Sequence, residues 1–362
     1  MTSPTPRPGV MSIEPYVGGK SALPGQARII KLSSNEGALG PRPRAMAEFA
    51  RLADTLHRYP DGSANDLRIA IAERFGLKAA QIVCGAGSDE LIALLTKAYA
   101  GPGDEVLYSQ YGFVMYPIAT HAAGATPVSA PETGYRTDVD ALIAKANART
   151  KLCFVANPNN PTGSYITGAE LKRLRSGLPA HTILVIDAAY AEYVSRNDYS
   201  GGIDLVDAHD NVVVMRTFSK IFALGGLRLG WAYGPPGIVD VLNRVRGPFN
   251  VSAAAQAAGI AALEDFAFSD RARSHNDRWL PWFAEQVTAL GLDVLPSVGN
   301  FVLVGFPAGA RNAANANTHL NRDGIIARAV ANYGLPDHIR FTIGTEEEMR
   351  VVVASLAAFM KT

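Results

Sequence analysis

Short apolar runs that alternate with helical segments are the feature that most constrains the fold of this chain. Six runs have the composition of buried strands: residues 105–108, 126–128, 151–155, 182–186, 211–215 and 231–233. Strands separated by helices in this way form a mostly parallel sheet that helices cover on both faces. The expected fold is therefore α/β. Ligands of such sheets bind beyond the carboxyl ends of the strands, so the ends of these runs are where a site is expected.

The pattern divides the chain into three parts. Residues 1–32 carry many prolines and glycines, which predicts an extended N-terminal arm. Residues 33–250 hold the alternating pattern and predict a large domain. Residues 251–362 begin with an alanine-rich helical stretch and predict a smaller α+β domain. In that last part we expect a mobile surface loop between Pro307 and Asn317, and a capping box at Thr345 and Glu348.

Composition excludes several classes of function. The chain has 362 residues with 34 Lys and Arg against 33 Asp and Glu, which argues against a nucleic-acid partner or an anionic membrane surface. Cys84 and Cys153 lack the paired spacing of a zinc site or a disulfide framework, so we expect no metal site and a reducing compartment. The N-terminus lacks the apolar core of a signal peptide, and no apolar run approaches the ~18 residues of a membrane span. We expect a cytoplasmic protein.

Lys220 follows one of the strand-like runs among apolar neighbours, in the sequence Arg216-Thr-Phe-Ser-Lys220. Burial disfavours the ammonium form and lowers the pKa of a lysine, and a neutral amine can form a Schiff base with an aldehyde. Pyridoxal phosphate (PLP) is one candidate aldehyde. The alternative is a lysine whose charged head reaches water from a loop, which is the commoner case for any single lysine.

Polar side chains also follow two other strand-like runs and one glycine turn. Asn157 to Gly163 form a turn fixed by prolines, Asp187 comes directly after Ile186, and Ser88 and Asp89 follow a glycine turn at the start of a helix. Each of these has a plain alternative, namely a turn, a cap and an ordinary helix start. A helix start can also bind phosphate through its unpaired N–H groups.

The ordered set of motifs resembles the fold type I PLP-dependent aminotransferases, and most closely the histidinol-phosphate aminotransferases. The resemblance extends over nearly the whole chain, through Pro15-Tyr16, Ser33 to Glu36, Tyr59 to Gly62, Gly87 to Glu90, Asn159 to Gly163, Asp187 to Tyr190, Thr217 to Lys220, Gly226 to Arg228, Leu335-Pro336 and Arg340 to Thr345. The chain departs from many relatives in having Gly37-Ala38 and Ala188.

The resemblance implies a role for each cofactor residue. Lys220 would hold PLP covalently and carry a proton during the reaction, and Asp187 would face the pyridine nitrogen. Asn160 and Tyr190 would hydrogen-bond the ring oxygen, and Tyr111 would stack on the ring. The phosphate would be held by Ser88, Asp89, Thr217, Ser219 and Arg228. Tyr59 would reach the phosphate of the neighbouring subunit, which implies a homodimer with shared active sites.

For the substrate, the resemblance implies binding by Arg340, Arg328, Tyr16 and Asn35. The leading hypothesis is transfer of an amino group from L-histidinol phosphate to 2-oxoglutarate, a step in histidine biosynthesis. The first alternative is an aromatic amino acid aminotransferase, because an arginine that binds a phosphate can also bind a carboxylate. A second alternative, of another reaction class, is a PLP-dependent decarboxylase of phosphothreonine type. A non-catalytic PLP-binding sensor is the least favoured, because the chain lacks room and charge for a DNA-binding domain.

Overall fold

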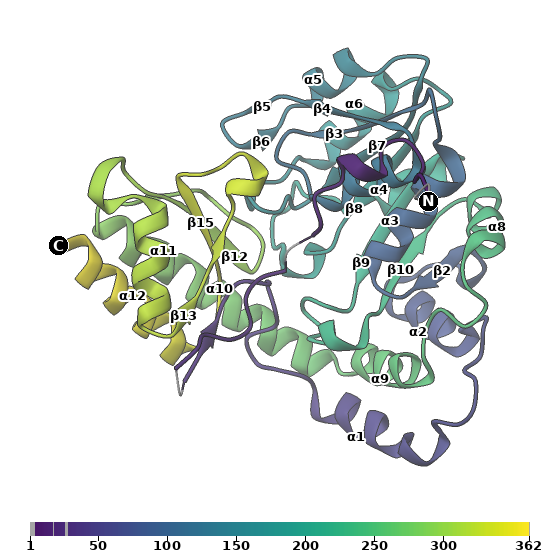
Figure 1. Cartoon of the computed structure of the whole chain (residues 1–362). Coiled ribbons are helices and arrows are strands. Elements are labelled where there is room, and N and C mark those ends of the chain that lie inside the picture. Colours follow the sequence, from purple (N-terminus) through teal and green to yellow (C-terminus); the bar gives the residue numbers. More distant parts are fainter. Residues whose placement is uncertain (1–3, 17, 26–27, 362) are drawn as a thin grey trace.

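The computed structural model describes residues 4–16, 18–25 and 28–361. Its largest element is a seven-stranded sheet (Figure 1) with the order β2 (Ile82–Gly85), β10 (Gly230–Tyr233), β9 (Val212–Thr217), β8 (Ile183–Asp187), β7 (Thr150–Ala156), β3 (Glu105–Ser109) and β4 (Thr126–Ala130). All neighbours pair in parallel except β10, which is antiparallel to both β2 and β9. The six expected strands are all present, and the run at 231–233 is the antiparallel one.

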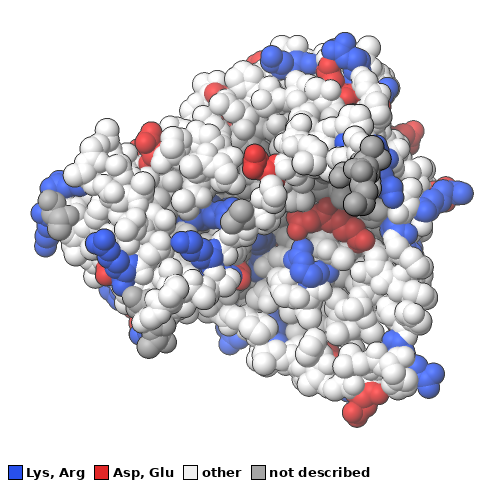
Figure 2. All heavy atoms as spheres, in the orientation of Figure 1, with Lys and Arg blue, Asp and Glu red and all other residues white. Residues whose placement is uncertain are grey.

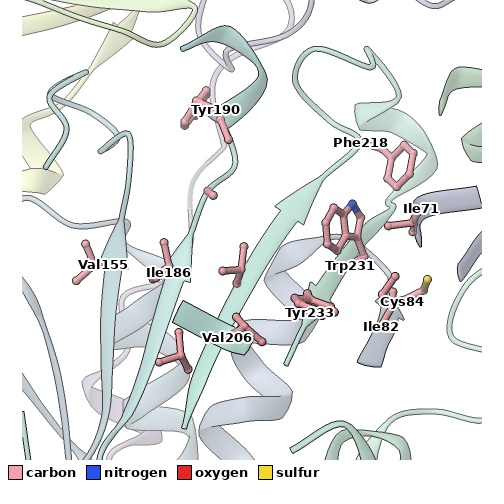
Figure 3. Packing of buried hydrophobic residues seen from close by; sticks show 14 of the residues in the cluster. Ile71, Ile82, Cys84, Val155, Ile186, Tyr190, Val206, Phe218, Trp231 and Tyr233 are labelled. Carbon is pink, nitrogen blue, oxygen red and sulfur yellow. The ribbon is translucent and has the colours of Figure 1, made fainter. Parts of the chain in front are cut away.

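Helices cover both faces of this sheet, as the alternation predicted (Figure 1). In β9, Val212 and Val214 point into one core and Val213 and Met215 into the other. Figure 3 shows part of the first core, where Trp231, Phe218 and Ile71 lie together. The helices are α1 (Pro43–Arg51), α2 (Asn65–Phe75), α3 (Ser88–Tyr99), α4 (Met115–Ala123), α5 (Val139–Lys145), α6 (Gly168–Gly177), α7 (Ile203–Ala208), α8 (Pro236–Val245) and α9 (Ala253–Glu264).

A second, antiparallel sheet lies apart from the first, on the left of Figure 1. Its order is β11 (Asp293–Val294), β12 (Phe301–Gly305), β15 (His338–Thr342) and β14 (Arg328–Ala329). The helices α10 (Phe266–Ala289), α11 (Ala313–Arg322) and α12 (Glu346–Lys361) contribute to its core. The capping box predicted at the start of α12 is confirmed, because Glu348 N donates to Thr345 Oγ1 and Thr345 N donates to Glu348 Oε2.

The N-terminal arm contains little regular structure in its described part. It has one 3-10 turn at Val10–Ser12, and β1 (Ile30–Lys31) pairs in parallel with β13 (Ile325–Ile326). The arm therefore ends beside the second sheet and leads from there into α1. Further along the chain, a small hairpin of β5 (Glu132–Thr133) and β6 (Arg136–Thr137) follows β4.

The prediction of a mobile surface loop between Pro307 and Asn317 is wrong. Most of that segment is a 3-10 turn followed by α11, whose cap Asn312 accepts a hydrogen bond from Asn315 N at 2.9 Å. Ala313, Ala316 and Leu320 are buried at helical spacing. The segment looked like a loop because its buried face is built mainly of alanine, which gives a weak hydrophobic pattern.

Candidate active site

A cavity of about 260 Å³ opens at the carboxyl ends of β7, β8 and β9, where the first sheet faces β14, β15 and the arm. Figure 2 shows a hollow on this side of the molecule with both basic and acidic side chains around it. The predicted residues that line the cavity are Tyr16, Asn35, Ser88, Asp89, Asn160, Asp187, Tyr190, Thr217, Ser219, Lys220, Arg228, Arg328 and Arg340. The sheet thus brings together side chains that lie far apart in the sequence.

Lys220 lies in the loop directly after β9. Its Nζ donates a hydrogen bond to the backbone oxygen of Ser34 at 3.0 Å and lies 5.6 Å from the centre of the Tyr190 ring. Burial, and then the positive charge of Arg340, lower the pKa of Lys220 to about 8. The neutral, nucleophilic form of this amine is therefore more populated near neutral pH than it is for an ordinary lysine.

Asp187 ends β8, and its side chain is buried. Oδ2 accepts a hydrogen bond from the Tyr116 hydroxyl at 3.0 Å, while Oδ1 is buried without a partner among the described residues. Burial raises the pKa of Asp187 to about 6. A buried carboxylate oxygen with no donor is costly, which indicates that a donor or a cation belongs beside it.

Tyr190 and Asn160 flank the same cavity. The Tyr190 hydroxyl accepts a hydrogen bond from Asn35 Nδ2 at 2.8 Å, so its own hydrogen remains to be donated. Burial raises the pKa of Tyr190, which keeps the hydroxyl protonated. Asn160 Oδ1 accepts from Arg340 Nη1, which leaves the amide N–H groups of Asn160 as donors. Asn35 is held on both sides, since its Oδ1 accepts from Thr342 Oγ1 at 3.1 Å.

The start of α3 and the loop after β9 form a cup of donors. Arg228 donates to Asp89 Oδ2 at 3.0 Å, and Ser88, Thr217 and Ser219 line the same part of the cavity. Gly87 has φ +86°, and a Cβ there would lie 2.3 Å from Arg228 Nη2. Only glycine allows this close approach of the arginine to the helix start, where free N–H groups and the helix dipole favour an anion.

Two arginines enter the cavity from the second sheet. Arg328 in β14 and Arg340 in β15 are paired in register. Arg340 is buried, donates to the backbone oxygen of Ser33 at 2.7 Å, and has an Nε–H without a partner among the described residues. Arg328 is half-buried, with its guanidinium 6.0 Å from the centre of the Tyr16 ring. This end of the cavity is suited to an anionic ligand.

Comparison with known proteins decides the family. The family model of class I and II aminotransferases matches residues 27–356. The chain is 62% identical over 361 residues to the histidinol-phosphate aminotransferase of Paramagnetospirillum magneticum, and the alignment covers 99% of both chains. It is 56% identical to that of Rhodospirillum centenum over the full length of both. The chain belongs to the histidinol-phosphate aminotransferase family.

The fold agrees with this family. A crystal structure of the histidinol-phosphate aminotransferase from Sinorhizobium meliloti in complex with pyridoxal-5'-phosphate has a TM-score of 0.85 and 28% identity, and the match covers 92% of each chain. Aspartate aminotransferase from Thermus thermophilus has the same fold, with a TM-score of 0.81 at 24% identity. The expected fold class, fold type I of the PLP-dependent transferases, is confirmed.

Tyr111 is the predicted ring-stacking residue that does not line the cavity of this aminotransferase. A tight turn, in which Gly112 N donates to Ser109 O at 2.7 Å, directs Tyr111 toward Tyr135, with the ring centres 5.8 Å apart. Phe113 lines the cavity instead. Both are aromatic and two residues apart, and the sequence pattern could not distinguish them without the geometry of this turn.

Tyr59 also lies outside the cavity. It is 82% exposed and stacks on Phe249, with the ring centres 4.6 Å apart. A role toward a neighbouring subunit therefore stays a prediction.

Among the described residues, neither the pattern of a metal site nor that of a membrane span occurs. Within residues 4–16, 18–25 and 28–361 there is no group of three or more His, Cys, Asp or Glu side chains that could hold a metal ion. No helix in the described part of the chain is long and apolar enough to cross a membrane.

Proposed function

We propose that this protein transfers the amino group of L-histidinol phosphate to 2-oxoglutarate, giving imidazole acetol phosphate and L-glutamate, with PLP as cofactor. The observation that carries the proposal is the arrangement of Lys220, Asp187 and Arg340 around one cavity, in a chain 62% identical to a histidinol-phosphate aminotransferase. These three residues provide an amine with a lowered pKa, a buried carboxylate oxygen without a partner among the described residues, and a buried guanidinium.

These residues fit PLP. The unpartnered Asp187 Oδ1 would pair with a protonated pyridine nitrogen, and the cup at the start of α3 would hold the phosphate through Ser88, Ser219 and Arg228. Asn160 and Tyr190 each retain a donor for the ring oxygen. Phe113 would contact the ring face, a role that the sequence assigned to Tyr111.

When bound, PLP supplies an electron sink that makes the hydrogen on the amino-bearing carbon of the substrate acidic. Residues of the chain would provide attachment of the cofactor, proton transfer, charge stabilisation and substrate binding. Lys220 would hold the cofactor covalently, and its amine, once free, would take up that proton and carry it to the cofactor. Asp187 would supply the negative charge that keeps the ring nitrogen protonated. Arg340 and Arg328 would bind the anionic end of the substrate.

Histidinol phosphate is favoured over an aromatic amino acid because its only strong anion is the phosphate. Two arginines can make several charge-assisted hydrogen bonds to a phosphate dianion, whereas a carboxylate gains less from the second. The register pairing of Arg328 with Arg340 places both at the same end of the cavity, which supports this choice.

A homodimer with shared sites is part of the same proposal. Large apolar side chains are exposed along α1 and the segment after it, at Met46, Phe49, Leu56 and Tyr59, with exposed fractions from 51% to 82%. Exposed apolar side chains gathered in one segment are typical of an interface. We infer that a second copy of the chain covers these apolar side chains, and that Tyr59 reaches the phosphate site of that second copy.

An amino-donor panel tests the function. Purified protein with PLP is given L-histidinol phosphate, phenylalanine or phosphothreonine, with 2-oxoglutarate present, and glutamate and carbon dioxide are measured. We expect glutamate formation with the highest kcat/KM for histidinol phosphate. A higher kcat/KM for phenylalanine would favour the aromatic aminotransferase, and carbon dioxide from phosphothreonine would favour the decarboxylase.

A further inference from the structure

Tyr116 is a buried residue whose surroundings suggest more than packing. It lies in the first turn of α4 and its side chain is fully buried. Its ring stacks on Phe154 of β7, with ring centres 4.7 Å apart and an angle of 11°. This contact fixes the ring against the sheet, so the position of its hydroxyl is also fixed.

The hydroxyl of Tyr116 donates to Asp187 Oδ2 at 3.0 Å. Because one carboxylate oxygen is occupied, the plane of the carboxylate is set and Oδ1 is left for another partner. The same tyrosine ring and that of Phe113 form an edge-to-face pair, with ring centres 6.0 Å apart and an angle of 88°. Tyr116 therefore touches both residues that would meet the nitrogen and the face of the cofactor ring, without lining the cavity itself.

We propose that Tyr116 is a positioning residue for the cofactor ring, which holds Asp187 and Phe113 in the orientation that binds pyridoxal phosphate. This inference rests on the proposed function only in assuming that PLP binds in this cavity. It does not depend on which amino donor is used.

The hydroxyl has an electrostatic role as well as a geometric one. Its hydrogen bond favours the ionised carboxylate and opposes the burial that raises the pKa of Asp187. Three other groups influence the pKa of this carboxylate: Asp89 opposes its ionisation, whereas the Ala189 backbone N–H and Lys220 favour it. Removal of the hydroxyl would leave Asp187 less ionised and its carboxylate plane no longer fixed by this hydrogen bond.

The test is the affinity of the full-length protein for PLP in Tyr116→Phe. This change keeps the ring stacked on Phe154 and removes only the hydroxyl. We expect the Kd for PLP to rise about tenfold, the scale of one hydrogen bond to a charged group. We also expect the visible circular dichroism of bound PLP to change, because the ring is held less firmly.

A matched control is Tyr108→Phe. Tyr108 is half-buried next to Tyr116, with ring centres 6.3 Å apart, and its hydroxyl has no hydrogen bond to the described residues. We expect the Kd of this variant for PLP to stay within about twofold of the wild-type value, because the substitution removes no hydrogen bond to the described residues. The unfolding temperature of each apoprotein checks that both variants fold.

A double-mutant cycle with Asp187→Asn separates positioning from packing. Asp187→Asn alone should lower kcat by about two to three orders of magnitude, because an amide cannot pair with a pyridinium through charge. If Tyr116 acts through Asp187, Tyr116→Phe should weaken PLP binding by less than about twofold in this background. An equal loss in both backgrounds, or a Tyr116→Phe affinity like that of Tyr108→Phe, would overturn the proposal. If the PLP affinities follow the expected pattern but the wild-type protein does not act on histidinol phosphate, the result counts against the proposed substrate and not against the role of Tyr116.

Discussion

The protonation state of Lys220 depends on its surroundings more than on its sequence neighbours. The sequence predicted a lysine with a lowered pKa at a strand end. The pKa is lowered by burial and by the charge of Arg340. Both effects arise only when the second sheet lies against the first. Arg340 lies 120 positions further along the chain, so no local pattern could have shown the pair.

This electrostatic setting gives a prediction for the apoprotein. The pKa of Lys220 is lowered to about 8, so the amine is mostly protonated below pH 8 and mostly neutral above it. The rate of covalent PLP attachment should therefore rise with pH and level off above about 8, well below the usual lysine pKa of about 10.4. The measurement is the absorbance change after PLP is added to apoprotein across pH 6 to 10.

The control is Lys220→Ala, which should bind PLP without a covalent bond and keep its fold. Reduction with borohydride followed by peptide mapping identifies the attached lysine. A rate that still rises steeply at pH 10, or a label on another lysine, would contradict the assignment.

At other positions the sequence identified the right segment and left the individual residue open. The loop after β3 was expected to supply an aromatic side chain, yet it presents Phe113 where Tyr111 was predicted. The sequence does not single out Tyr116, because a tyrosine in an apolar helix is ordinarily a core residue. Its bond to Asp187 links residues 71 positions apart and becomes visible only in three dimensions.

At the scale of elements, the strands that carry the site were predictable because they are apolar runs that end in polar residues. β7, β8 and β9 all lie where the sequence placed them, and their ends meet as parallel strands require. α11 was missed because alanine forms most of its buried face. The direction of β10 was also not predicted, because strand direction depends on the path of the chain between strands.

The pair β14 and β15 gives the prediction about the substrate. Arg328→Ala should raise KM for histidinol phosphate about tenfold. Loss of a buried charged contact costs roughly 2 to 5 kcal/mol, and the contact of the partly exposed Arg328 should contribute less than that. It should change KM for phenylalanine less. Arg340→Ala should impair both substrates, since Arg340 also holds Asn160 and the backbone of Ser33.

Arg328→Lys is the matched control, because it keeps the charge and loses the planar fork. Its KM for histidinol phosphate should fall between those of the wild type and Arg328→Ala. Steady-state kinetics with both donors provide the data. Equal effects of Arg328→Ala on the two substrates would mean that Arg328 does not select for phosphate.

At the scale of the whole molecule, the exposed apolar segment around α1 leads to a prediction about assembly. Co-expression of a Lys220→Ala subunit with a Tyr59→Phe subunit should give heterodimers in which one site has both Lys220 and the partner's Tyr59 intact. The purified heterodimer should be more active than the average of its two parent homodimers. Sedimentation checks the oligomeric state, and an active monomer would disprove shared sites.

The central claim is that Lys220, Asp187 and the two arginines form the site of an aminotransferase for histidinol phosphate. A single-turnover experiment tests it most directly. Protein with bound PLP is mixed with L-histidinol phosphate in the absence of 2-oxoglutarate, and imidazole acetol phosphate, carbon dioxide and the visible absorbance of the cofactor are followed. We predict one equivalent of product per subunit, loss of the visible absorbance, no carbon dioxide, and further turnover only after 2-oxoglutarate is added. Release of carbon dioxide, continued turnover without the acceptor, or no product from histidinol phosphate would contradict the account.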